Sequence, residues 1–206
     1  MQDVIVVGAG GQGLIVADIL LQSAGMRAIG VVADDAATRP REILGIPILG
    51  PLELLSQTPH DAIVVAIGDN RVRRLVTERL AGSGETIIAV RHPFTSIAAD
   101  ATIGAGSMIS AGVVITPGAT IGRGVLLNTG CSIDHQSSVG DFAHVSVHVT
   151  IGANCAIGEE TLIAVGATVT TGRRVGARTV IGAGAVVVRD IGDDVVAYGV
   201  PARVVR

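Results

Sequence analysis

The sequence predicts two units: a small α/β domain over residues 1–92 and an all-β solenoid over residues 93–206. Strand-like and helix-like segments alternate in the first unit, whereas an aliphatic residue recurs every six positions in the second. In addition, 49% of the residues are hydrophobic but only 1% are aromatic. Because a globular core of this size ordinarily uses aromatic side chains to fill irregular volume, an aliphatic interior indicates a regular, repeating core.

The first unit has the pattern of a parallel sheet covered by helices. It opens with the β-branched run 4–7, and the glycine-rich segment 8–13 leads into a helical pattern of apolar residues that ends near Gly25. Further strands are expected over 28–33, 62–67 and 86–90, and a short helix over 52–55. A second long helix is expected to carry on its polar side Arg71, Arg73, Arg74 and Glu78.

The second unit is defined by its period of six. Ile, Leu or Val occupies the same phase of sixteen consecutive hexads, at positions 97, 103, 109, 115, 121, 127, 133, 139, 145, 151, 157, 163, 169, 175, 181 and 187. The residue two positions earlier is nearly always small, with Arg173 as the exception. Neither a helix nor a single strand sustains this period. A three-sided solenoid does, since each hexad supplies one side and one corner, and stacked coils bury each other's faces.

Composition narrows the chemistry and the partners. The net charge is −3 without a basic run, so neither nucleic acid nor an anionic membrane surface is indicated as a partner. The chain contains arginine but no lysine, which excludes Schiff-base and pyridoxal-phosphate chemistry through a lysine amine. The two cysteines, the start without a leader pattern and the lack of a long apolar stretch predict a cytoplasmic protein without membrane insertion.

The glycine-rich segment 8–13 has the spacing of a dinucleotide-binding loop, and Asp34 and Asp35 follow it at the distance such loops require. The first unit is too short for a complete six-strand dinucleotide fold, so we expect another phosphate-bearing nucleotide rather than NAD. Glycine lets the backbone approach a phosphate, and the following helix presents free N–H groups to it. Gly68, Asp69 and Asn70 end the third strand beside this crevice, although a helix cap also explains the last two.

Four further motifs complete a pattern that resembles a known family. They are 66–70 (Ala-Ile-Gly-Asp-Asn), 127–130 (Leu-Asn-Thr-Gly), 134–135 (Asp-His) and 199–203 (Gly-Val-Pro-Ala-Arg). With the glycine segment and the hexads, their order and spacing resemble the NeuD/PglD-type sugar acetyltransferases of the hexapeptide-repeat acyltransferase superfamily. The resemblance implies a Rossmann-like N-terminal domain, a left-handed parallel β-helix and a homotrimer.

The resemblance also implies the two substrates. Acetyl-CoA is expected in the groove between neighbouring β-helices, and a nucleotide-linked amino sugar in the N-terminal domain, with no metal. The sugar is most often a UDP-linked 4-amino-4,6-dideoxy sugar, while some relatives use GDP- or dTDP-linked sugars or acetylate a hydroxyl of sialic acid. The residues expected to bind the nucleotide sugar are Gly8, Gly10, Gly11, Gln12, Gly13, Asp34, Asp35, Gly68, Asp69 and Asn70.

Acetyl transfer to an amine needs an unprotonated nucleophile and a base for the released proton, and histidine suits this role near neutral pH. His135 lies in a polar interruption of the solenoid. By resemblance it is the general base of a direct transfer in a ternary complex, and Asp134, Gln136 and Asn128 line the same pocket. Relatives often carry an acidic residue in place of Gln136 and a histidine in place of Gln12. Gln136 can orient the imidazole but cannot offset its positive charge.

His144 matches a second histidine of the family, beside the thioester or the acceptor sugar, where its ring N–H can bond the developing oxyanion. The residues expected to bind acetyl-CoA are His144, Ala153, Ala164, Gly166, Arg173, Gly182 and Pro201. Arg173, Arg174 and Arg178 interrupt the small-residue rule together. They indicate either an outward basic cluster for the CoA phosphates or a solvated face.

Other classes of protein stay open. A β-helix carbonic anhydrase would hold zinc with three histidines, and His135, His144 and His148 suffice in number but not in spacing. The chain could also form a non-catalytic trimer that binds nucleotide sugars, in which case Gln136 would indicate that catalytic activity has been lost. Within the enzymes, O-acetylation of a sugar competes with N-acetylation. A hydroxyl depends more on an effective base than an amine does, so Gln136 favours the amine.

Overall fold

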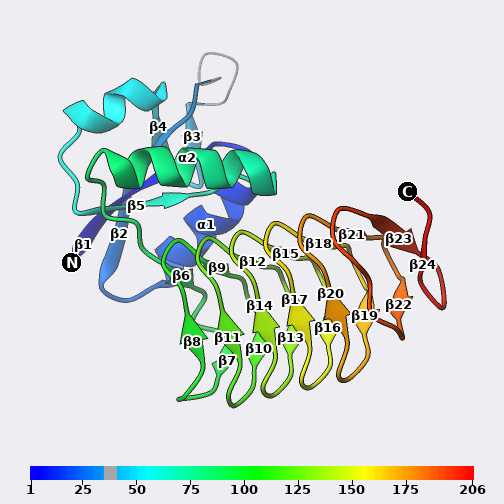
Figure 1. Cartoon of the computed structure of the whole chain (residues 1–206). Helices are drawn as coiled ribbons and strands as arrows, with labels where there is room; N and C mark the ends of the chain where they lie inside the picture. Colours follow the sequence, from blue (N-terminus) through cyan, green and yellow to red (C-terminus); the bar gives the residue numbers. More distant parts are fainter. Residues whose placement is uncertain (35–40) are drawn as a thin grey trace.

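The computed structural model describes residues 1–34 and 41–206 and contains two units (Figure 1). The first is a five-stranded sheet of order β3-β4-β2-β1-β5, in which only the β3–β4 pairing among the described strands is antiparallel. Its elements are β1 (Gln2–Val7), α1 (Gly11–Gln22), β2 (Met26–Val32), β3 (Glu42–Ile43), β4 (Ile46–Gly50), the 3₁₀ helix η2 (Leu52–Gln57), β5 (Ala62–Val65) and α2 (Asn70–Gly82).

Strand β1 is buried on both faces of this sheet. Val4 and Val6 belong to a core cluster with α1 and with the first coils of the solenoid. Ile5 and Val7 belong to a cluster on the other face, with residues of η2 and α2. A strand that is covered on both faces is a continuous hydrophobic run, which explains the unbroken apolar sequence 4–7.

Two expectations for this unit are wrong, and two elements were not expected. Segment 86–90 contributes only the bridge between Ile63 and Ile87, while Val90 and Arg91 form the first strand of the solenoid. Arg73 does not lie on an exposed polar face, because the solenoid covers that side of α2 and buries the arginine completely. The short strands β3 and β4 were not expected.

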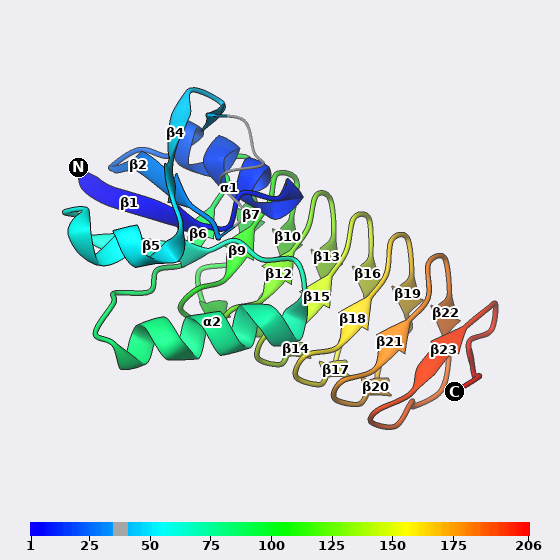
Figure 2. The same ribbon diagram turned by 90° about the horizontal axis from the view of Figure 1, so that it is seen from above.

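The second unit is the left-handed parallel β-helix that the family resemblance implied (Figures 1 and 2). Its first sheet has the order β24-β23-β21-β18-β15-β12-β9-β6, its second β22-β19-β16-β13-β10-β7, and its third β20-β17-β14-β11-β8. The strands are β6 (Val90–Arg91), β7 (Ser96–Ile97), β8 (Thr102–Ile103), β9 (Met108–Ile109), β10 (Val114–Ile115), β11 (Thr120–Ile121), β12 (Leu126–Leu127), β13 (Ser132–Ile133), β14 (Ser138–Val139), β15 (His144–Val145), β16 (Thr150–Ile151), β17 (Ala156–Ile157), β18 (Leu162–Ile163), β19 (Thr168–Val169), β20 (Arg174–Val175), β21 (Val180–Ile181), β22 (Val186–Val187), β23 (Val196–Tyr198) and β24 (Arg203–Val204).

The hexad prediction is confirmed. The aliphatic residues from Ile109 to Val187 are buried in one continuous core, and only Ile97 and Ile103 at the open end are partly exposed. Equivalent residues stack in register one coil apart, as Ile115 does on Ile133. The residue two positions before each of these aliphatic residues is less often small than expected, because buried valine occupies positions 113, 125 and 149.

Hydroxyl groups join successive coils where the chain turns. Ser137 Oγ donates to the Gly152 carbonyl at 2.8 Å and accepts from the Cys155 N–H at 3.0 Å. Ser107 makes the same pair of bonds at another turn, five hexads earlier in the chain. These bonds satisfy the buried backbone groups of the turn, which explains why small polar residues occur there.

The loops between the sheets form three stacked edges, which we call corners. Corner 1 joins the first sheet to the second and includes the loops 110–113, 128–131, 146–149, 164–167 and 182–185. Corner 2 joins the second sheet to the third through 116–119, 134–137, 152–155 and 170–173. Corner 3 returns to the first sheet through 104–107, 122–125, 140–143, 158–161 and 176–179.

The α/β unit covers the first coils on the outer face of the first sheet. The outward side chains of Met108 and Leu126 are buried there and share one apolar cluster with Val90 and α1. This apolar contact fixes the α/β unit beside the first sheet, with α2 above it (Figure 2). In residues 1–34 and 41–206 we find no helix whose length and apolar character would let it cross a membrane.

Candidate active site

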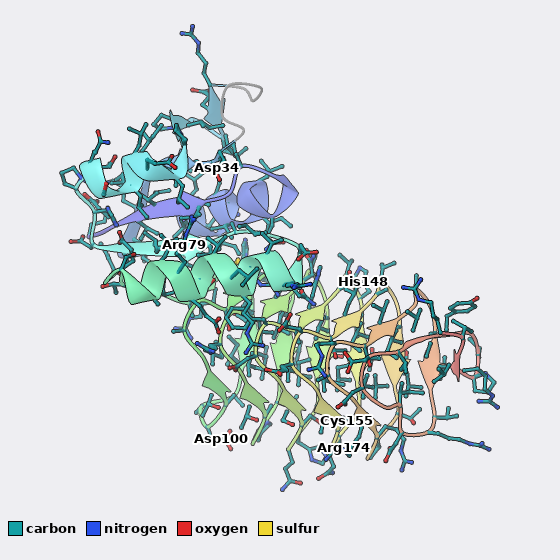
Figure 3. All side chains as sticks on the ribbon, turned by 45° about the horizontal axis from the view of Figure 1, so that its top comes forward. Asp34, Arg79, Asp100, His148, Cys155 and Arg174 are labelled. Atoms are coloured by element: carbon teal, nitrogen blue, oxygen red, sulfur yellow. The ribbon has the colours of Figure 1, made fainter. Side chains whose placement is uncertain are left out.

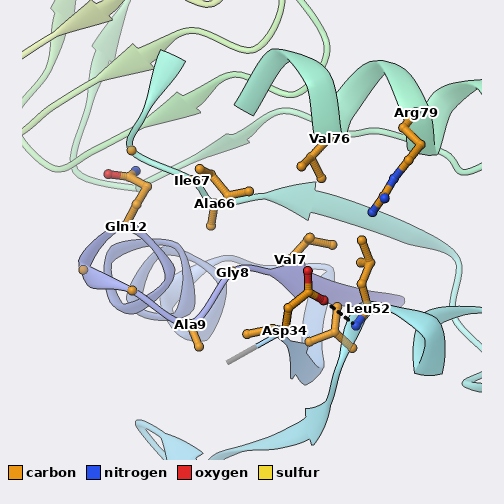
Figure 4. A pocket seen from close by; sticks show the side chains of 15 residues that line it. Val7, Gly8, Ala9, Gln12, Asp34, Leu52, Ala66, Ile67, Val76 and Arg79 are labelled. Carbon is orange, nitrogen blue, oxygen red and sulfur yellow. Dashed lines mark hydrogen bonds between the residues drawn. The ribbon is translucent and has the colours of Figure 1, made fainter. Parts of the chain in front are cut away.

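The α/β unit contains a cavity of about 460 Å³ at the carboxyl ends of its parallel strands (Figure 4). This is the edge at which open α/β sheets bind ligands. Of the residues expected to bind the nucleotide sugar, six line the cavity, namely Gly8, Gly10, Gly11, Gln12, Asp34 and Gly68. Gly13 is a buried residue of α1 outside this lining, and Asp35 lies outside the described residues.

The glycines serve two different purposes. Gly8 has φ +114°, and a Cβ there would lie 2.7 Å from the Ala66 carbonyl oxygen. A Cβ on Gly13 would collide with the Gly8 carbonyl, so glycine lets α1 approach β1 closely. By contrast, a Cβ on Gly10 or Gly11 would meet nothing within 4 Å. These two glycines leave the backbone open toward the cavity.

The first turn of α1 presents unpaired donors to this cavity. Gly10 caps the helix without a side-chain bond, and the first helical hydrogen bond runs from the Leu14 N–H to the Gly10 carbonyl at 3.1 Å. In the part of the chain that the structure describes, the N–H groups of Gly11, Gln12 and Gly13 have no protein acceptor. Free N–H groups at a helix N-terminus attract a phosphate. The cavity is therefore suited to the diphosphate of a nucleotide.

A carboxylate and a guanidinium both line the far end of the cavity. Asp34 Oδ1 accepts from the Leu52 N–H at 3.1 Å, which orients the carboxylate. Arg79 points from α2 toward Asp34 and Leu52 across the cavity (Figure 4). Sequence reasoning missed Arg79, which lies one turn of helix after Val76, and both residues line the cavity. An acceptor and a donor that face one cavity can hydrogen-bond a nucleobase or a ribose.

A second cavity of about 410 Å³ lies between the start of α2 and the first sheet. It shares Gly68 with the nucleotide cavity and is also lined by Asp69, Asn70 and His144. Asp69 caps α2 by accepting from the Val72 N–H at 2.8 Å, as the capping alternative predicted. Asn70 Nδ2 donates to the Glu160 carbonyl at 2.9 Å, so this side chain also joins α2 to corner 3.

His144 stands on β15 between Leu126 and Leu162 of neighbouring strands. Its Nε2 atom is buried and has no hydrogen-bond partner among the described residues. Burial and, second, the positive charge of Arg73 lower the pKa of His144 to about 4. The imidazole is therefore neutral at pH 7. Within one chain it lies with the expected nucleotide-sugar residues rather than with the expected acetyl-CoA residues.

His135 is an exposed residue of corner 2. Its N–H donates to Asp134 Oδ1 at 2.7 Å, and Thr116 Oγ1 donates to the same oxygen at 3.2 Å. Gln136 has φ +58°, and its N–H donates to the Pro117 carbonyl at 3.1 Å. The corner thus holds the backbone on both sides of His135, and no side chain or backbone group in residues 1–34 and 41–206 hydrogen-bonds its imidazole. Ala153 belongs to the same corner one coil later.

Asn128 does not lie in the pocket of His135 within one chain, contrary to expectation. It begins a loop of corner 1, and β13 of the second sheet separates it from Asp134. Ala164, Gly166 and Gly182 also belong to corner 1. Pro201 lies next to them, because the segment around it bonds to β22 through the Ala202 N–H and the Gly199 carbonyl. The expected acetyl-CoA residues therefore divide between two corners.

Arg173, Arg174 and Arg178 do not form one cluster. Arg173 is in corner 2 and lies 3.8 Å from Asp190, while Arg174 is on the third sheet. Arg178 is in corner 3 and forms a bidentate pair with Asp194 at 2.7 Å for each bond. Figure 3 shows Arg174 across the β-helix from His148, which lies in corner 1. Arg173, Arg174 and Arg178 are close in sequence but project to different sides. The reason is that the chain passes from corner 2 along the third sheet to corner 3 between Arg173 and Arg178.

The described residues contain no group of three His, Cys, Asp or Glu side chains that could hold a metal ion. In particular, His135, His144 and His148 stand on corner 2, the first sheet and corner 1 of the chain. One chain therefore does not bring the three histidines together.

Comparison with known proteins identifies the first unit and relates the chain to sugar acetyltransferases. Residues 3–80 match the family of the PglD N-terminal domain. Over 113 residues the chain is 31% identical to the UDP-N-acetylbacillosamine N-acetyltransferase of Bacillus subtilis. This match covers 54% of the chain and 52% of the relative, so the chain aligns with about half the length of this curated relative.

Solved structures resemble the chain over its whole length. The acetyltransferase domain of PglB from Neisseria gonorrhoeae is 33% identical, with 100% of both chains covered and a TM-score of 0.94. PerB from Caulobacter crescentus, solved in complex with CoA and GDP-perosamine, is 31% identical, with a TM-score of 0.93 over 100% of this chain and 98% of that one. This likeness in sequence and fold shows that the chain belongs to the PglD-type sugar acetyltransferases, a family of acyltransferases.

Proposed function

We propose that the chain transfers the acetyl group of acetyl-CoA to the amine of a nucleotide-linked sugar, with a UDP-4-amino-4,6-dideoxy sugar as the first candidate. The observation that carries this proposal is the whole-length likeness to PerB, which was solved with CoA and GDP-perosamine. The PglB acetyltransferase domain, at 33% identity, was solved with acetyl coenzyme A. We expect the enzyme in the cytoplasm, where both kinds of substrate are made.

The nucleotide is assigned to the cavity of the α/β unit. Its diphosphate would lie against the free N–H groups of Gly11, Gln12 and Gly13. Its base or ribose would lie between Asp34 and Arg79, and the sugar would extend past Gly68 toward the second cavity. The helix N-terminus and the presence of Asp34 and Arg79 in the lining support this orientation.

The transfer itself needs one proton acceptor. The amine nitrogen attacks the thioester carbonyl carbon and forms the C–N bond, and the tetrahedral intermediate then breaks the C–S bond. His135 accepts the proton that the nitrogen loses and returns it to the departing thiolate, so that the products are an amide and CoA. The exposed imidazole of His135 and the bonds that fix its backbone support this role.

A homotrimer would complete the site. Corner 1 with Asn128 and corner 2 with His135 lie on different edges of one β-helix. In a closed ring, corner 1 of one chain would face corner 2 of the next. Acetyl-CoA would then lie in the groove between them, against the small residues Ala153, Ala164, Gly166 and Gly182, with Arg173 and Pro201 toward its end.

Incubation with acetyl-CoA and matched UDP-, GDP- and dTDP-linked 4-amino sugars tests the proposal. We expect release of CoA thiol with one nucleotide and formation of the N-acetyl sugar, identified by mass. Transfer only to a sugar hydroxyl would replace N-acetylation with O-acetylation. Tight binding of a nucleotide sugar without thiol release would instead indicate the non-catalytic binding protein.

A further inference from the structure

Arg73 is a fully buried arginine that joins the two units of the chain. Toward the β-helix, its Nε donates to the Gly124 carbonyl at 2.8 Å. Its Nη2 donates to the Phe142 carbonyl at 2.7 Å and, at a longer 3.4 Å, to the Ala143 carbonyl. These acceptors belong to two successive loops of corner 3. The side chain therefore reaches through the outer surface of the solenoid to its backbone.

The same guanidinium also holds the turn that precedes α2. Nη1 donates to the carbonyls of Ile67 at 2.9 Å and Gly68 at 3.0 Å, and Nη2 donates to Asn70 Oδ1 at 2.9 Å. A guanidinium has five N–H groups, and the six acceptors use all of them. One side chain thus fixes the turn 67–70 and corner 3 relative to each other.

Every hydrogen-bond acceptor of Arg73 is a neutral oxygen. Burial lowers the pKa of Arg73 to about 10, so the group still carries its charge at pH 7. Even a buried ion pair can often be replaced by apolar residues of similar volume without loss of stability. Fastening α2 to the β-helix therefore does not by itself require an arginine. Fixing the direction of several backbone carbonyls at once does require its planar set of donors.

The turn that Arg73 fixes is the common wall of the two cavities. Gly68 lines both the nucleotide cavity and the cavity of His144. Asn70 is held at both ends of its amide, because Oδ1 accepts from Arg73 and Nδ2 donates to the Glu160 carbonyl. A displaced turn would change how the two cavities meet at Gly68.

We propose that Arg73 is a positioning residue for the acceptor sugar, since it fixes the turn Gly68–Asn70 against β15 so that the two cavities form one continuous binding site. This inference rests on the proposed function, because it is the nucleotide-linked sugar that would extend from one cavity into the other. Arg73 touches no substrate in this arrangement. It acts through Gly68 and Asn70.

Arg73 also influences His144 on the other side of the turn. The charged groups that face His144 are Asp69, Arg71 and Arg73 from α2, and Glu160 and Arg178 from the β-helix. Among them, Arg73 is the one whose charge lowers the pKa of His144 in addition to burial. The arginine thus favours a neutral imidazole at the place where the sugar would pass.

Two substitutions at Arg73 and one matched control test the proposal. Arg73→Lys keeps the charge but cannot bond all six acceptors, and Arg73→Gln removes the charge and keeps a polar amide. Arg74→Gln is the control, because Arg74 also ties α2 to the β-helix, through ion pairs with Glu159 at 3.0 Å and Glu160 at 2.6 Å, but does not bond the turn. The measurements are calorimetric affinities for the nucleotide sugar and for acetyl-CoA, kcat and KM, and an NMR titration of His144.

We expect Arg73→Lys to weaken binding of the nucleotide sugar and raise its KM by roughly 10- to 100-fold, the scale of a misplaced binding segment. Affinity for acetyl-CoA stays as in the wild type, and Arg74→Gln changes neither affinity. The pKa of His144 rises in Arg73→Gln but not in Arg73→Lys. If Arg73→Gln does not fold, Arg73→Lys alone decides the affinity comparison.

Wild-type affinity for the nucleotide sugar in a folded Arg73→Lys would overturn the proposal. So would an equal loss in Arg74→Gln, because Arg73 would then only fasten the helix. A wild-type protein that binds no nucleotide sugar would contradict the proposed function instead. In that case an unchanged pKa of His144 in Arg73→Gln would still reject the link between the two residues.

Discussion

Asn128 and His135 are seven positions apart in sequence, yet they lie on different corners of the β-helix with β13 between them. Both are expected near the reacting groups, and a single chain does not bring them into one pocket. The same division separates Ala164, Gly166 and Gly182 from Ala153 and Arg173. We therefore propose that a site that uses both sets is built by two chains.

The proposed base can be tested by removing its imidazole. His135→Ala is expected to lower kcat on the order of 10²-fold or more, the usual effect of losing a general base. Its affinity for acetyl-CoA should be unchanged. His60→Gln is a suitable control, because His60 pairs with Glu85 in the α/β unit, away from both corners. Full activity of His135→Ala would mean that the departing thiolate takes the proton without help.

The glycines of the nucleotide loop are expected to differ in their tolerance of a methyl group. Gly13→Ala should lower the free energy of unfolding by about 1–3 kcal/mol, because its Cβ has no space beside the Gly8 carbonyl. Gly11→Ala should leave the stability unchanged or raise it slightly, since nothing lies within 4 Å and alanine favours a helix. Denaturant unfolding of the two variants provides the comparison. Equal stabilities would contradict the close approach of α1 to β1.

Arg79 is expected to contribute to nucleotide affinity. Arg79→Gln should weaken binding of the nucleotide sugar roughly tenfold, the scale of one lost hydrogen bond from a charged donor. Arg91→Gln is a control of the same chemistry, because Arg91 is exposed and lies outside the nucleotide cavity. Calorimetry with the free nucleoside diphosphate, which lacks the sugar, would show whether the lost affinity belongs to the nucleotide part of the ligand. An unchanged affinity would place the base or ribose away from α2.

His144 is expected to make stability depend on pH. Its pKa falls from 6.5 to about 4 on folding, so between these values the unfolded chain binds a proton that the folded chain does not. The free energy of unfolding should therefore decrease as the pH falls from 6.5 to 4, by up to about 3 kcal/mol. His144→Leu, which matches Leu126 and Leu162 beside it, should remove this part of the decrease. The same slope in both proteins would contradict a buried neutral imidazole.

The solenoid was predictable from sequence because a period of six admits few other structures. The buried ladder from Ile109 to Val187 follows that period without a break. The sequence also contained the information that these residues lie at different corners. Asn128, Ala164 and Gly182 share one phase of the 18-residue coil. Asp134 and Ala153 have a different phase, because they are one coil and one residue apart. Recognising it requires counting coils rather than hexads.

Other features depend on contacts between the units and are not visible in the local sequence. Arg73 has the position of a solvent-facing arginine in a helical pattern, and only the solenoid packed against α2 makes it buried. Arg79 looks like its neighbours in sequence until the fold places it over the nucleotide cavity. The short strands β3 and β4 contain too few residues for a periodic signal.

Mixing two inactive variants tests most directly whether acetyl transfer occurs at a site shared between chains. Chains with His135→Ala and chains with Asn128→Ala are co-expressed, and thiol release is measured with acetyl-CoA and the preferred nucleotide amino sugar. If each site takes corner 1 from one chain and corner 2 from the next, random mixing restores about a quarter of the wild-type rate. A mixture no more active than the separate variants would contradict the shared site.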